Sequence, residues 1–365
     1  MARSALVIGI GGQDGSLLAE LLLGKRYEVF GVVRRPVSER YPNLEALRAQ
    51  ITLIQADLLD ELSLVDALRE AEPDEIYNLA APSFVPNSWR QPILTAKIAA
   101  MGAAALLEAA RLVVPEARFY QATSSEIFGD PVETPQTEET PLAPVTPYGV
   151  AKAYAHFLVR SYRRQYGLHA SSGILYNHES PRRRPEFLPR KVANAAARIA
   201  LGLDNEVRLG SLDARRDWGY AGDYVRAMWL MLQQDEPDDF VIATGVSHSV
   251  LDLVDVAFRR VGLDWEQHVR TDGAFVRGQA ELHSLVGDPS KARRQLAWEP
   301  SIDFTALVHM LVDADLERLR VERDASSWDD LLRARRSVCH VSCAVCSQEN
   351  RPACANPRAL SLRRS

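Results

Sequence analysis

The main part of this 365-residue chain lacks cysteine: all 4 cysteines lie in the last 27 residues. Residues 1–330 therefore hold no disulfide, which favours a cytoplasmic protein. A basic excess is also missing, because 43 Lys and Arg stand against 48 Asp and Glu, and the resulting charge of −5 argues against nucleic acid as the main partner. No run of 18 apolar residues appears and the N-terminus leads straight into a strand-like run, so neither a membrane span nor a secretory signal is expected.

The C-terminal segment 331–365 differs from the rest in composition. It holds seven Arg, no Lys and one acid, Glu349, whereas residues 1–330 carry 36 basic against 47 acidic side chains. Its cysteines lack the two paired C-x-x-C spacings that are typical of zinc sites, so we expect no metal there. We interpret the segment as a disordered, arginine-rich extension. The cysteines in question are Cys339, Cys343, Cys346 and Cys354.

The first half alternates short apolar runs with stretches of helical periodicity. The chain is long enough for about two domains. Buried parallel strands are predicted at 5–8, 28–33, 51–56, 75–80 and 117–123, and helices at 17–23, 61–71 and 95–113. This alternation predicts an α/β fold built on a Rossmann-type doubly wound parallel sheet.

The second half is less regular and predicts a smaller α/β lobe that binds the substrate. The expected elements are strands at 171–177 and 239–243 and helices at 188–202, 222–234 and 249–262. We therefore divide the chain into a dinucleotide-binding domain over 1–170, an interleaved substrate lobe over 171–330 and the extension over 331–365.

Gly9, Gly12 and Gly15 follow the first strand and open the first helix. Glycines at this spacing permit a tight turn and let the backbone approach a pyrophosphate, which the helix N-terminus also attracts. Gln13 and Asp14 lie within the turn and are assigned to the same cofactor site.

Roughly 20 residues further on, where an NAD enzyme has an acid for the ribose 2′-hydroxyl, this chain has Arg34 and Arg35. A guanidinium pairs with a 2′-phosphate instead, so the predicted cofactor is NADP. Asp57, after the third strand, is a candidate for the adenine amino group, with Leu58 beside it.

Tyr148 and Lys152 stand four residues apart on a predicted helix and so share one face. An ammonium close to a phenol lowers the phenol pKa, which prepares Tyr148 to take a proton from a sugar hydroxyl. Ser124 ends the fifth predicted strand, at the sheet edge where α/β enzymes bind ligands, and is placed beside that hydroxyl. Glu126 supplies a second base, which an elimination reaction requires.

These motifs resemble the extended short-chain dehydrogenases/reductases, and among them the GDP-mannose 4,6-dehydratase family, over residues 5 to 320. The glycine turn and the Tyr/Lys pair belong to the whole superfamily, whereas two further stretches are more specific to the dehydratases. These stretches are NHESPRR (177–183) and LDARRDWG (212–219).

The resemblance implies a hydro-lyase that converts GDP-mannose to GDP-4-dehydro-6-deoxymannose. Tyr148 deprotonates O4 while the C4 hydride passes to NADP⁺, and Glu126 removes the C5 proton made acidic by the new ketone. The C6 hydroxyl leaves as water and the hydride returns to C6. The enzymes of this family also imply a homodimer or homotetramer.

Carried over by position, a further set of residues is expected at the substrate: Ser83, Asn177, Glu179, Arg182, Arg190, Lys191, Arg216, Arg277 and Glu281. Three stretches depart from the family pattern. Pro82 and Phe84 replace Gln and His, one extra residue separates Arg277 from Glu281, and the loop Pro36–Tyr41 is shorter, which favours a dimer over a tetramer.

Two other functions remain open at this point. A nucleotide-sugar 4-epimerase or 4-keto reductase of the same superfamily needs Tyr148 and Lys152 but makes Glu126 incidental. A non-catalytic nucleotide-binding homologue needs none of the three, although Ser124, Tyr148 and Lys152 are all present.

Overall fold

A computed structural model of the chain describes residues 2–273 and 285–324. Within it, residues 1–316 form one compact unit and residues 317 onward a second, whose described residues 317–324 are helical. The first unit contains every element discussed below. The predicted domain boundaries at 170 and 330 stay predictions.

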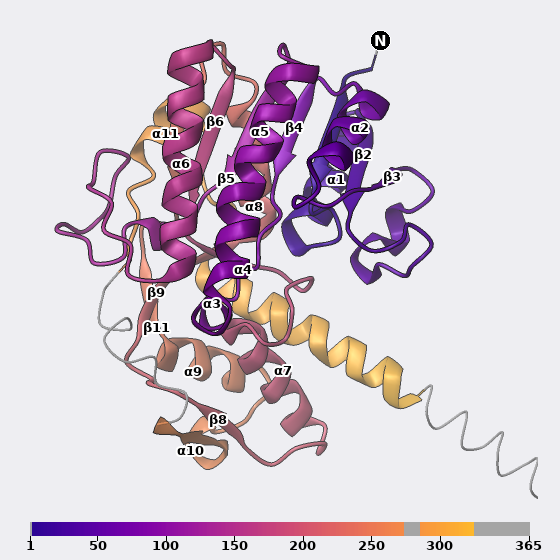
Figure 1. The fold of residues 1–365 in the computed structure, drawn as a ribbon. Coiled ribbons are helices and arrows are strands. Elements are labelled where there is room, and N and C mark those ends of the chain that lie inside the picture. The colour runs from indigo at the N-terminus through magenta and orange to yellow at the C-terminus, as the bar shows by residue number, and fades with distance from the viewer. Residues whose placement is uncertain (1, 274–284, 325–365) are drawn as a thin grey trace, which may run out of the picture. The chain divides into compact units, whose positions relative to one another are not determined.

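The first unit is built on a parallel sheet of seven strands in the order β10-β6-β5-β4-β1-β2-β3 (Figure 1). The order reverses between β1 and β4, which is the place where doubly wound sheets bind ligands at the carboxyl ends of their strands. The Rossmann-type prediction is thereby confirmed. The strands are β1 (Ser4–Ile8), β2 (Glu28–Val33), β3 (Thr52–Gln55), β4 (Glu75–Asn78), β5 (Arg118–Ala122), β6 (Ala170–Leu175) and β10 (Asp239–Ile242).

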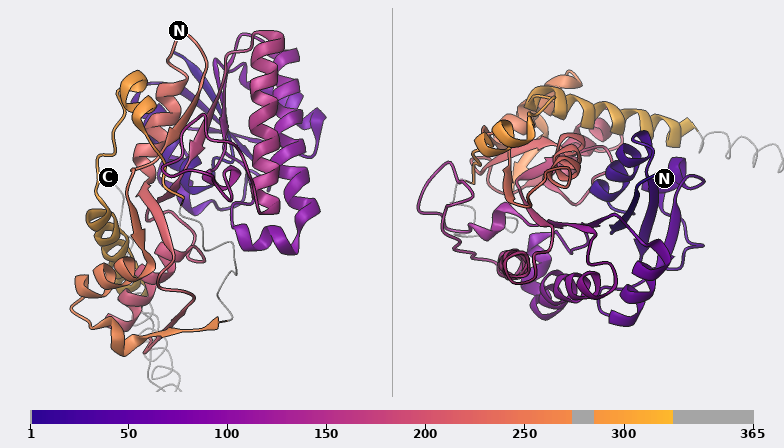
Figure 2. Two further views of the ribbon diagram at one scale, coloured as in Figure 1. Left: turned by 90° about the vertical axis from the view of Figure 1, so that its left-hand side faces the viewer. Right: turned by 90° about the horizontal axis from the view of Figure 1, so that it is seen from above.

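Helices cover both faces of this sheet (Figure 2). One face packs against α1 and α8, the other against α2, α5 and α6, and each interface is an apolar cluster of mostly buried Leu, Val, Ile and Ala. The helices of these layers are α1 (Gln13–Gly24), α8 (Ala221–Met231), α11 (Ser290–Leu296), α2 (Glu61–Ala71), α3 (Val85–Arg90), α4 (Pro92–Ala96), α5 (Gly102–Val113) and α6 (Pro147–Tyr166).

A smaller lobe lies beyond the carboxyl ends of the strands (Figure 1). Its core joins α7 and α9 to Trp218 and to the helical residues that begin at 304. Two short sheets complete it, in the orders β11-β9-β7 and β12-β8. Its elements are β7 (Asn177–Glu179), α7 (Leu188–Ala200), β8 (Val207–Leu209), β9 (Arg215–Tyr220), β11 (Ser247–Ser249), α9 (Val250–Arg260), α10 (Trp265–His268) and β12 (Val269–Thr271).

The predicted helix over 95–113 is the clearest difference in element boundaries. The structure begins it at α4, passes through one π-helical turn (Lys97–Met101) and continues as α5. Helical periodicity does not reveal a wider turn inside a continuous apolar run. By contrast, the helix over 61–71 matches to the residue, because Asp60 caps its first N–H groups through its side chain.

By length and composition, the same run from Pro92 to Val113 passes as a helix able to cross a membrane. A search for 18 consecutive apolar residues does not detect it, because Lys97, Glu108 and Arg111 interrupt the run. Half of its most apolar window is buried inside the protein. It packs against α2 and α6 in the described structure, as a core helix does.

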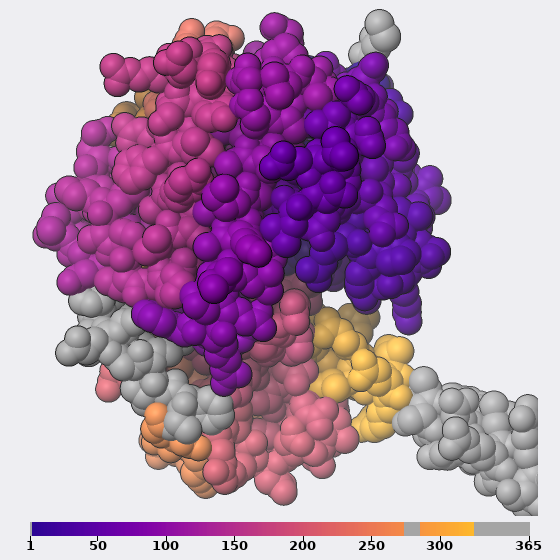
Figure 3. All heavy atoms as spheres, in the orientation of Figure 1, coloured from indigo at the N-terminus to yellow at the C-terminus, as the bar shows by residue number. Residues whose placement is uncertain are grey.

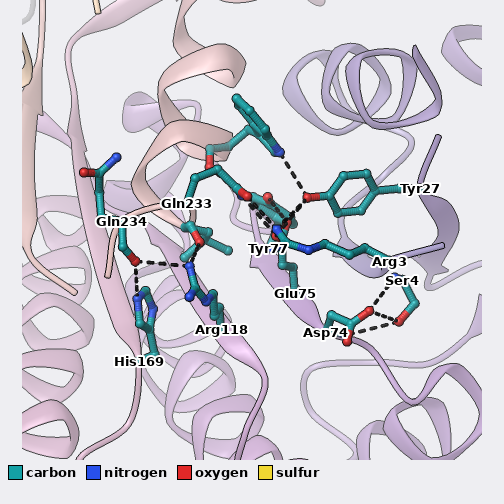
Figure 4. A network of polar contacts seen from close by, with 12 residues as sticks. Arg3, Ser4, Tyr27, Asp74, Glu75, Tyr77, Arg118, His169, Gln233 and Gln234 are labelled. Atoms are coloured by element: carbon teal, nitrogen blue, oxygen red, sulfur yellow. Dashed lines mark hydrogen bonds and ion pairs between the residues drawn. The ribbon is translucent and has the colours of Figure 1, made fainter. Parts of the chain in front are cut away.

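A polar network fastens the amino ends of the strands, on the side away from the ligand edge (Figure 4). The carboxylate of Glu75 is 1% exposed and accepts hydrogen bonds from Tyr77 at 2.6 Å, Tyr27 at 3.0 Å and Gln233 at 3.0 Å. Arg3 pairs with it at 3.4 Å. One carboxylate thus joins β1, β2, β4 and the end of α8.

Replacing this carboxylate should destabilise the fold. In Glu75→Ala, the buried Tyr77 and Tyr27 and the half-buried Gln233 lose their shared acceptor, which we expect to cost about 3 kcal/mol in the free energy of unfolding. Urea denaturation followed by circular dichroism measures the loss, and Glu28→Ala, at an exposed glutamate on β2, is the matched control. Equal midpoints for the two variants would contradict the role given to Glu75.

Candidate active site

The glycine turn has the geometry that its sequence predicts. Gly9 has a φ of +84°, and the N–H of Gly12 donates to its carbonyl at 3.0 Å. A Cβ at Gly15 would lie 2.4 Å from the Gly9 oxygen, so only glycine allows α1 to start this close to β1. Gly12 is the N-cap of α1 and offers no side-chain cap to the first turn, whose N–H groups therefore face the ligand edge of the sheet.

Arg34 and Arg35 follow the end of β2, and both are exposed. Arg35 pairs with Glu39 at 2.9 Å and lies over the ring of Tyr41. Asp57 is half-buried after β3, where its carboxylate accepts the N–H of Leu59, and Leu58 packs against Gly102. These positions line the edge of β2 and β3 on the side to which the glycine turn opens.

The catalytic pair lies in the first two turns of α6. The helix begins because Thr146 caps it, its hydroxyl accepting the N–H of Gly149 at 3.0 Å, and because Pro147 fits the first helical position. A Cβ on Gly149 would stand 2.4 Å from the carbonyl oxygen of Glu126, so this glycine lets α6 touch the turn that carries Glu126. Tyr148 and Lys152 are both buried and face the same cavity.

The electrostatics of this pair differ from the sequence expectation. The amino group of Lys152 donates to the carbonyl of Ala122 at 2.7 Å and lies 5.7 Å from the centre of the Tyr148 ring. Burial lowers the pKa of Lys152 to about 8. Burial also raises the pKa of Tyr148, although a hydrogen bond from Ser124 acts in the opposite direction. The protein alone therefore does not produce the lowered phenol pKa that we predicted.

Glu126 lies in a short 3₁₀ turn that follows β5, η3 (Ser125–Ile127), and Ser124 is the N-cap of this turn. The Ser124 hydroxyl caps this turn by accepting the N–H of Glu126 at 3.3 Å. A carboxylate oxygen of Glu126 accepts the Thr146 hydroxyl at 3.4 Å. Since Thr146 also caps α6, one hydroxyl links the turn of Glu126 to the helix of Tyr148.

These groups surround one cavity of ≈ 580 Å³ at the carboxyl edge of the sheet. Its wall continues onto α3 and the smaller lobe, where Phe84 contacts Phe187 edge-on at 5.5 Å. Figure 3 shows the sheet domain, indigo to magenta, above the pink and orange atoms of the smaller lobe. Of the predicted site residues, the lining includes Asp14, Ser83, Ser124, Glu126, Tyr148, Lys152, Asn177, Glu179, Lys191 and Arg216.

The NHESPRR stretch supplies part of the cavity wall, and sequence reasoning missed two of its members, His178 and Arg183. Burial raises the pKa of Glu179, which is 1% exposed and pairs with Arg183 at 3.4 Å. Arg183 and His178 both line the cavity. From the sequence alone, one cannot tell which of the two adjacent arginines, Arg182 or Arg183, points into the cavity. Nor does the sequence around His178 indicate that its partner is Asp14.

The structure does not bring Arg182 and Arg190 to the cavity. Arg182 extends along α1 and pairs with Glu20 at 2.7 Å. Arg190 is buried and pairs with the equally buried Asp315 at 2.7 Å, so its charge is neutralised inside the lobe. This geometry gives no support to their predicted substrate role.

The remaining predicted residues have clear places. Lys191 donates to the carbonyl of Arg208 at 2.6 Å and Arg216 to that of Arg215 at 2.6 Å, both at the lobe side of the cavity. Arg277, Glu281 and the cysteine-rich segment 331–365 lie outside the described residues. Across residues 2–273 and 285–324, no group of three or more His, Cys, Asp or Glu side chains is arranged to hold a metal ion.

Comparison with known proteins agrees with this geometry. The family model described as GDP-mannose 4,6 dehydratase matches residues 6–311. "GDP-mannose 4,6 dehydratase 1" of Arabidopsis thaliana is 47% identical, covering 90% of this chain and 94% of its own, and the Homo sapiens "GDP-mannose 4,6 dehydratase" is 43% identical, covering 88% and 93%.

Among solved structures, UDP-glucose 4-epimerase of Thermotoga maritima, determined with UDP-glucose, superposes with a TM-score of 0.77 at 26% identity. That match covers 86% of this chain and 99% of the epimerase. The fold is thus shared with an epimerase at 26% sequence identity. The two dehydratases share 47% and 43% sequence identity over 90% and 88% of this chain. The chain belongs to the GDP-mannose 4,6-dehydratase family.

Proposed function

We propose that this chain converts GDP-α-D-mannose to GDP-4-dehydro-6-deoxy-α-D-mannose and water, with NADP as a cofactor that is regenerated in each turnover. The observation that carries the proposal is the presence of Glu126 in the same cavity as Ser124, Tyr148 and Lys152. A 4-epimerase or 4-keto reductase removes no proton at C5, whereas a 4,6-dehydratase requires a base for it.

The residues present fit the cofactor. The close approach of Gly9 and Gly15 and the uncapped first turn of α1 form a cradle for a pyrophosphate. Arg34 and Arg35 supply cations for a 2′-phosphate. When bound, NADP would accept and return a hydride, and its oxidised nicotinamide would carry a positive charge. A positive charge held near Tyr148 would lower the phenol pKa, which Lys152 alone does not do.

The chain's own groups divide the proton transfers. Tyr148 takes the O4 proton while Ser124 holds that oxygen by a hydrogen bond. Glu126 then takes the C5 proton and delivers it to the departing C6 hydroxyl, so that water leaves and the carboxylate is restored. When the hydride is returned to C6, C5 takes up one proton and Tyr148 gives up the proton it took from O4, so that both groups end in their starting states. Lys152 stays near the Tyr148 ring and keeps a cation there below its pKa of about 8.

Incubation with GDP-mannose, without added reductant, tests the proposal. We expect mass spectrometry to show loss of one water from the nucleotide sugar and no net change in NADPH absorbance. An isomer of unchanged mass would mean epimerisation, and binding without turnover would mean a non-catalytic homologue. Either result would overturn the proposed activity.

The arginine pair leads to a prediction about cofactor choice. Replacing both Arg34 and Arg35 with Ala removes the cations for a 2′-phosphate, so we expect NADP to bind about 10–100-fold more weakly. NAD binding should not change, since NAD has no such phosphate. Fluorescence titration with both dinucleotides measures this, and Arg40→Ala is the control at a nearby exposed arginine. Equal weakening of both dinucleotides would contradict the assignment.

The proposal includes a homodimer in the cytoplasm, a compartment that suits the cysteine-free residues 1–330. Apolar side chains remain exposed on the outer face of α6 and on the neighbouring α4 and π turn: Ile93 is 73% exposed, Met101 57%, Val150 55% and Phe157 52%. α4 and the π turn both pack against α6, so these residues lie on adjoining elements, and we infer that they form one face. A second copy of this face is its natural partner, since a two-fold dimer buries the same patch of each subunit.

A charge on this face should separate the subunits. Phe157→Glu is expected to shift the protein from dimer to monomer in size-exclusion chromatography with light scattering, because burying an unpaired carboxylate is costly. Leu62→Glu, at an exposed leucine of α2, should leave the dimer intact. A wild-type monomer, or a dimer that survives Phe157→Glu, would contradict this interface.

A further inference from the structure

Asp14 and His178 lie 164 positions apart in the chain, yet they meet in the cavity wall. Oδ2 of Asp14, in the first turn of α1, is 2.9 Å from Nε2 of His178 on β7. The other ring nitrogen, Nδ1, is 2.7 Å from the carbonyl oxygen of Tyr176. The ring also stacks on Tyr224 of α8, with centroids 4.5 Å apart at 21°.

This arrangement fixes the protonation state of His178. A carbonyl oxygen only accepts hydrogen bonds, and so does an ionised carboxylate. Both ring nitrogens therefore donate, which requires the imidazolium form. The buried imidazolium of His178 is thus paired with the buried carboxylate of Asp14. The stacked ring of Tyr224 fixes the orientation of the imidazolium plane.

Gln13 adds a second link between the same two elements. Its amide nitrogen donates to Oδ1 of Asp14 at 2.8 Å and to the carbonyl of His178 at 3.2 Å. Its amide oxygen accepts the Ser180 hydroxyl at 2.9 Å. The first turn of α1 therefore holds the chain on both sides of Glu179, whose carboxylate faces the cavity.

We propose that Asp14 and His178 form a positioning pair that locks residues 177–180, the sugar side of the cavity, to the helix that holds the cofactor. The inference rests on the proposed function only for the identity of the ligands. Asn177 and Glu179 keep their places relative to Tyr148 because the imidazolium and the carboxylate hold β7 to α1. The pair acts through these residues and supplies no step of the reaction.

The charges around the pair make it sensitive to alkaline pH. His178 faces Asp14 on α1, Glu179 and Arg183 on its own strand and the turn after it, and the Tyr224 phenol on α8. Burial lowers the pKa of His178, but the charge and hydrogen bond of Asp14 outweigh burial and raise it above 6.5. Burial raises the pKa of Asp14, while His178 and Arg183 together lower it to about 2.

The raised pKa of His178 sets the direction of the pH dependence. A histidine with a raised pKa keeps its pairing below that pKa and loses it as pH rises through it. Asp14 stays ionised throughout this range. The pairing of His178 with Asp14 should therefore weaken as pH rises through the pKa of His178, where the imidazolium loses a proton. As pH rises, the KM for GDP-mannose should increase before kcat falls.

The test uses imidazole NMR titration of the NADP-loaded protein with Asp14→Asn, Asp14→Glu and Glu20→Gln. The signal of His178, one of 8 histidines, is identified by its loss in His178→Asn. In Asp14→Asn we expect its protonation midpoint to fall by more than one pH unit, a more than tenfold loss of proton affinity. KM for GDP-mannose at pH 8 should rise about tenfold, with a smaller change in kcat.

The two other variants separate charge from simple disruption. Asp14→Glu keeps a carboxylate and should retain a raised midpoint. Glu20→Gln removes an exposed carboxylate that also links α1 to this stretch, through Arg182, and should change neither the midpoint nor KM. An unchanged His178 midpoint in Asp14→Asn would overturn the proposed positioning role of the pair. Equal changes in midpoint and KM for Asp14→Asn and Glu20→Gln would overturn it too. Because the titration requires no turnover, inactivity toward GDP-mannose would refute the proposed function and leave this inference standing.

Discussion

Tyr148→Phe should lower kcat for GDP-mannose dehydration by about 10²–10⁴-fold, the range that a general acid–base group contributes. The variant removes only the phenol oxygen, and with it the group that takes the O4 proton. The ring, in the first turn of α6, stays buried, so we expect the fold and the affinity for NADP to be unchanged. Stopped-flow measurement of cofactor reduction isolates the affected step, since no reduced cofactor should form.

The control for this variant is Tyr166→Phe, which removes the same atom from a half-exposed tyrosine at the last turn of α6. It should retain wild-type kcat. Fast cofactor reduction in Tyr148→Phe would show that another group deprotonates O4 and would remove Tyr148 from the mechanism.

Glu126→Gln should abolish dehydration by a similar factor of about 10²–10⁴, but at a later step. The amide cannot take the C5 proton, whereas oxidation at C4 does not need the carboxylate. The hydride then has no C6 acceptor, so we expect reduced NADP to accumulate to about one equivalent per site without loss of water. The absorbance of NADPH and the mass of the nucleotide sugar distinguish this outcome from general inactivation.

Glu139→Gln is the matched control, because Glu139 is an exposed carboxylate in the loop between η3 and α6. It should turn over normally and leave no reduced cofactor behind. If Glu126→Gln dehydrates GDP-mannose at the wild-type rate, elimination uses a different base. The presence of Glu126 in the cavity would then no longer support the proposed function. If the variant neither oxidises nor dehydrates, Glu126 acts before the elimination.

Features set by short-range pattern could be predicted from the sequence. Gly9, Gly12 and Gly15 form the predicted turn, and Tyr148 and Lys152 face one cavity because a spacing of four places them on one side of a helix. Residues at the ends of parallel strands, such as Ser124, reach the ligand edge because all these strands end on the same side.

Features set by contacts between distant segments could not be predicted in this way. Arg190 resembles a phosphate ligand in the sequence, and only the fold shows that Asp315 neutralises it in the core. Arg182 and Arg183 are adjacent and chemically identical, yet only Arg183 reaches the cavity. The contact of Asp14 with His178 likewise depends on the fold, which brings β7 next to the start of α1.

The packing of α8 against α1 has a consequence for the newly made chain. α8, which packs beside α1 in the same apolar cluster, comes almost 200 residues after it, and β10, which completes the sheet, comes later still. A ribosome that has released only residues 1–170 has therefore made the dinucleotide turn, α1 and the strands beneath it, but not the residues of α8, such as Val225 and Met228, that belong to the same cluster. The nucleotide-binding half can complete this packing only after the sugar-binding half is translated, and until then the apolar surface left open beside α1 is a target for chaperones.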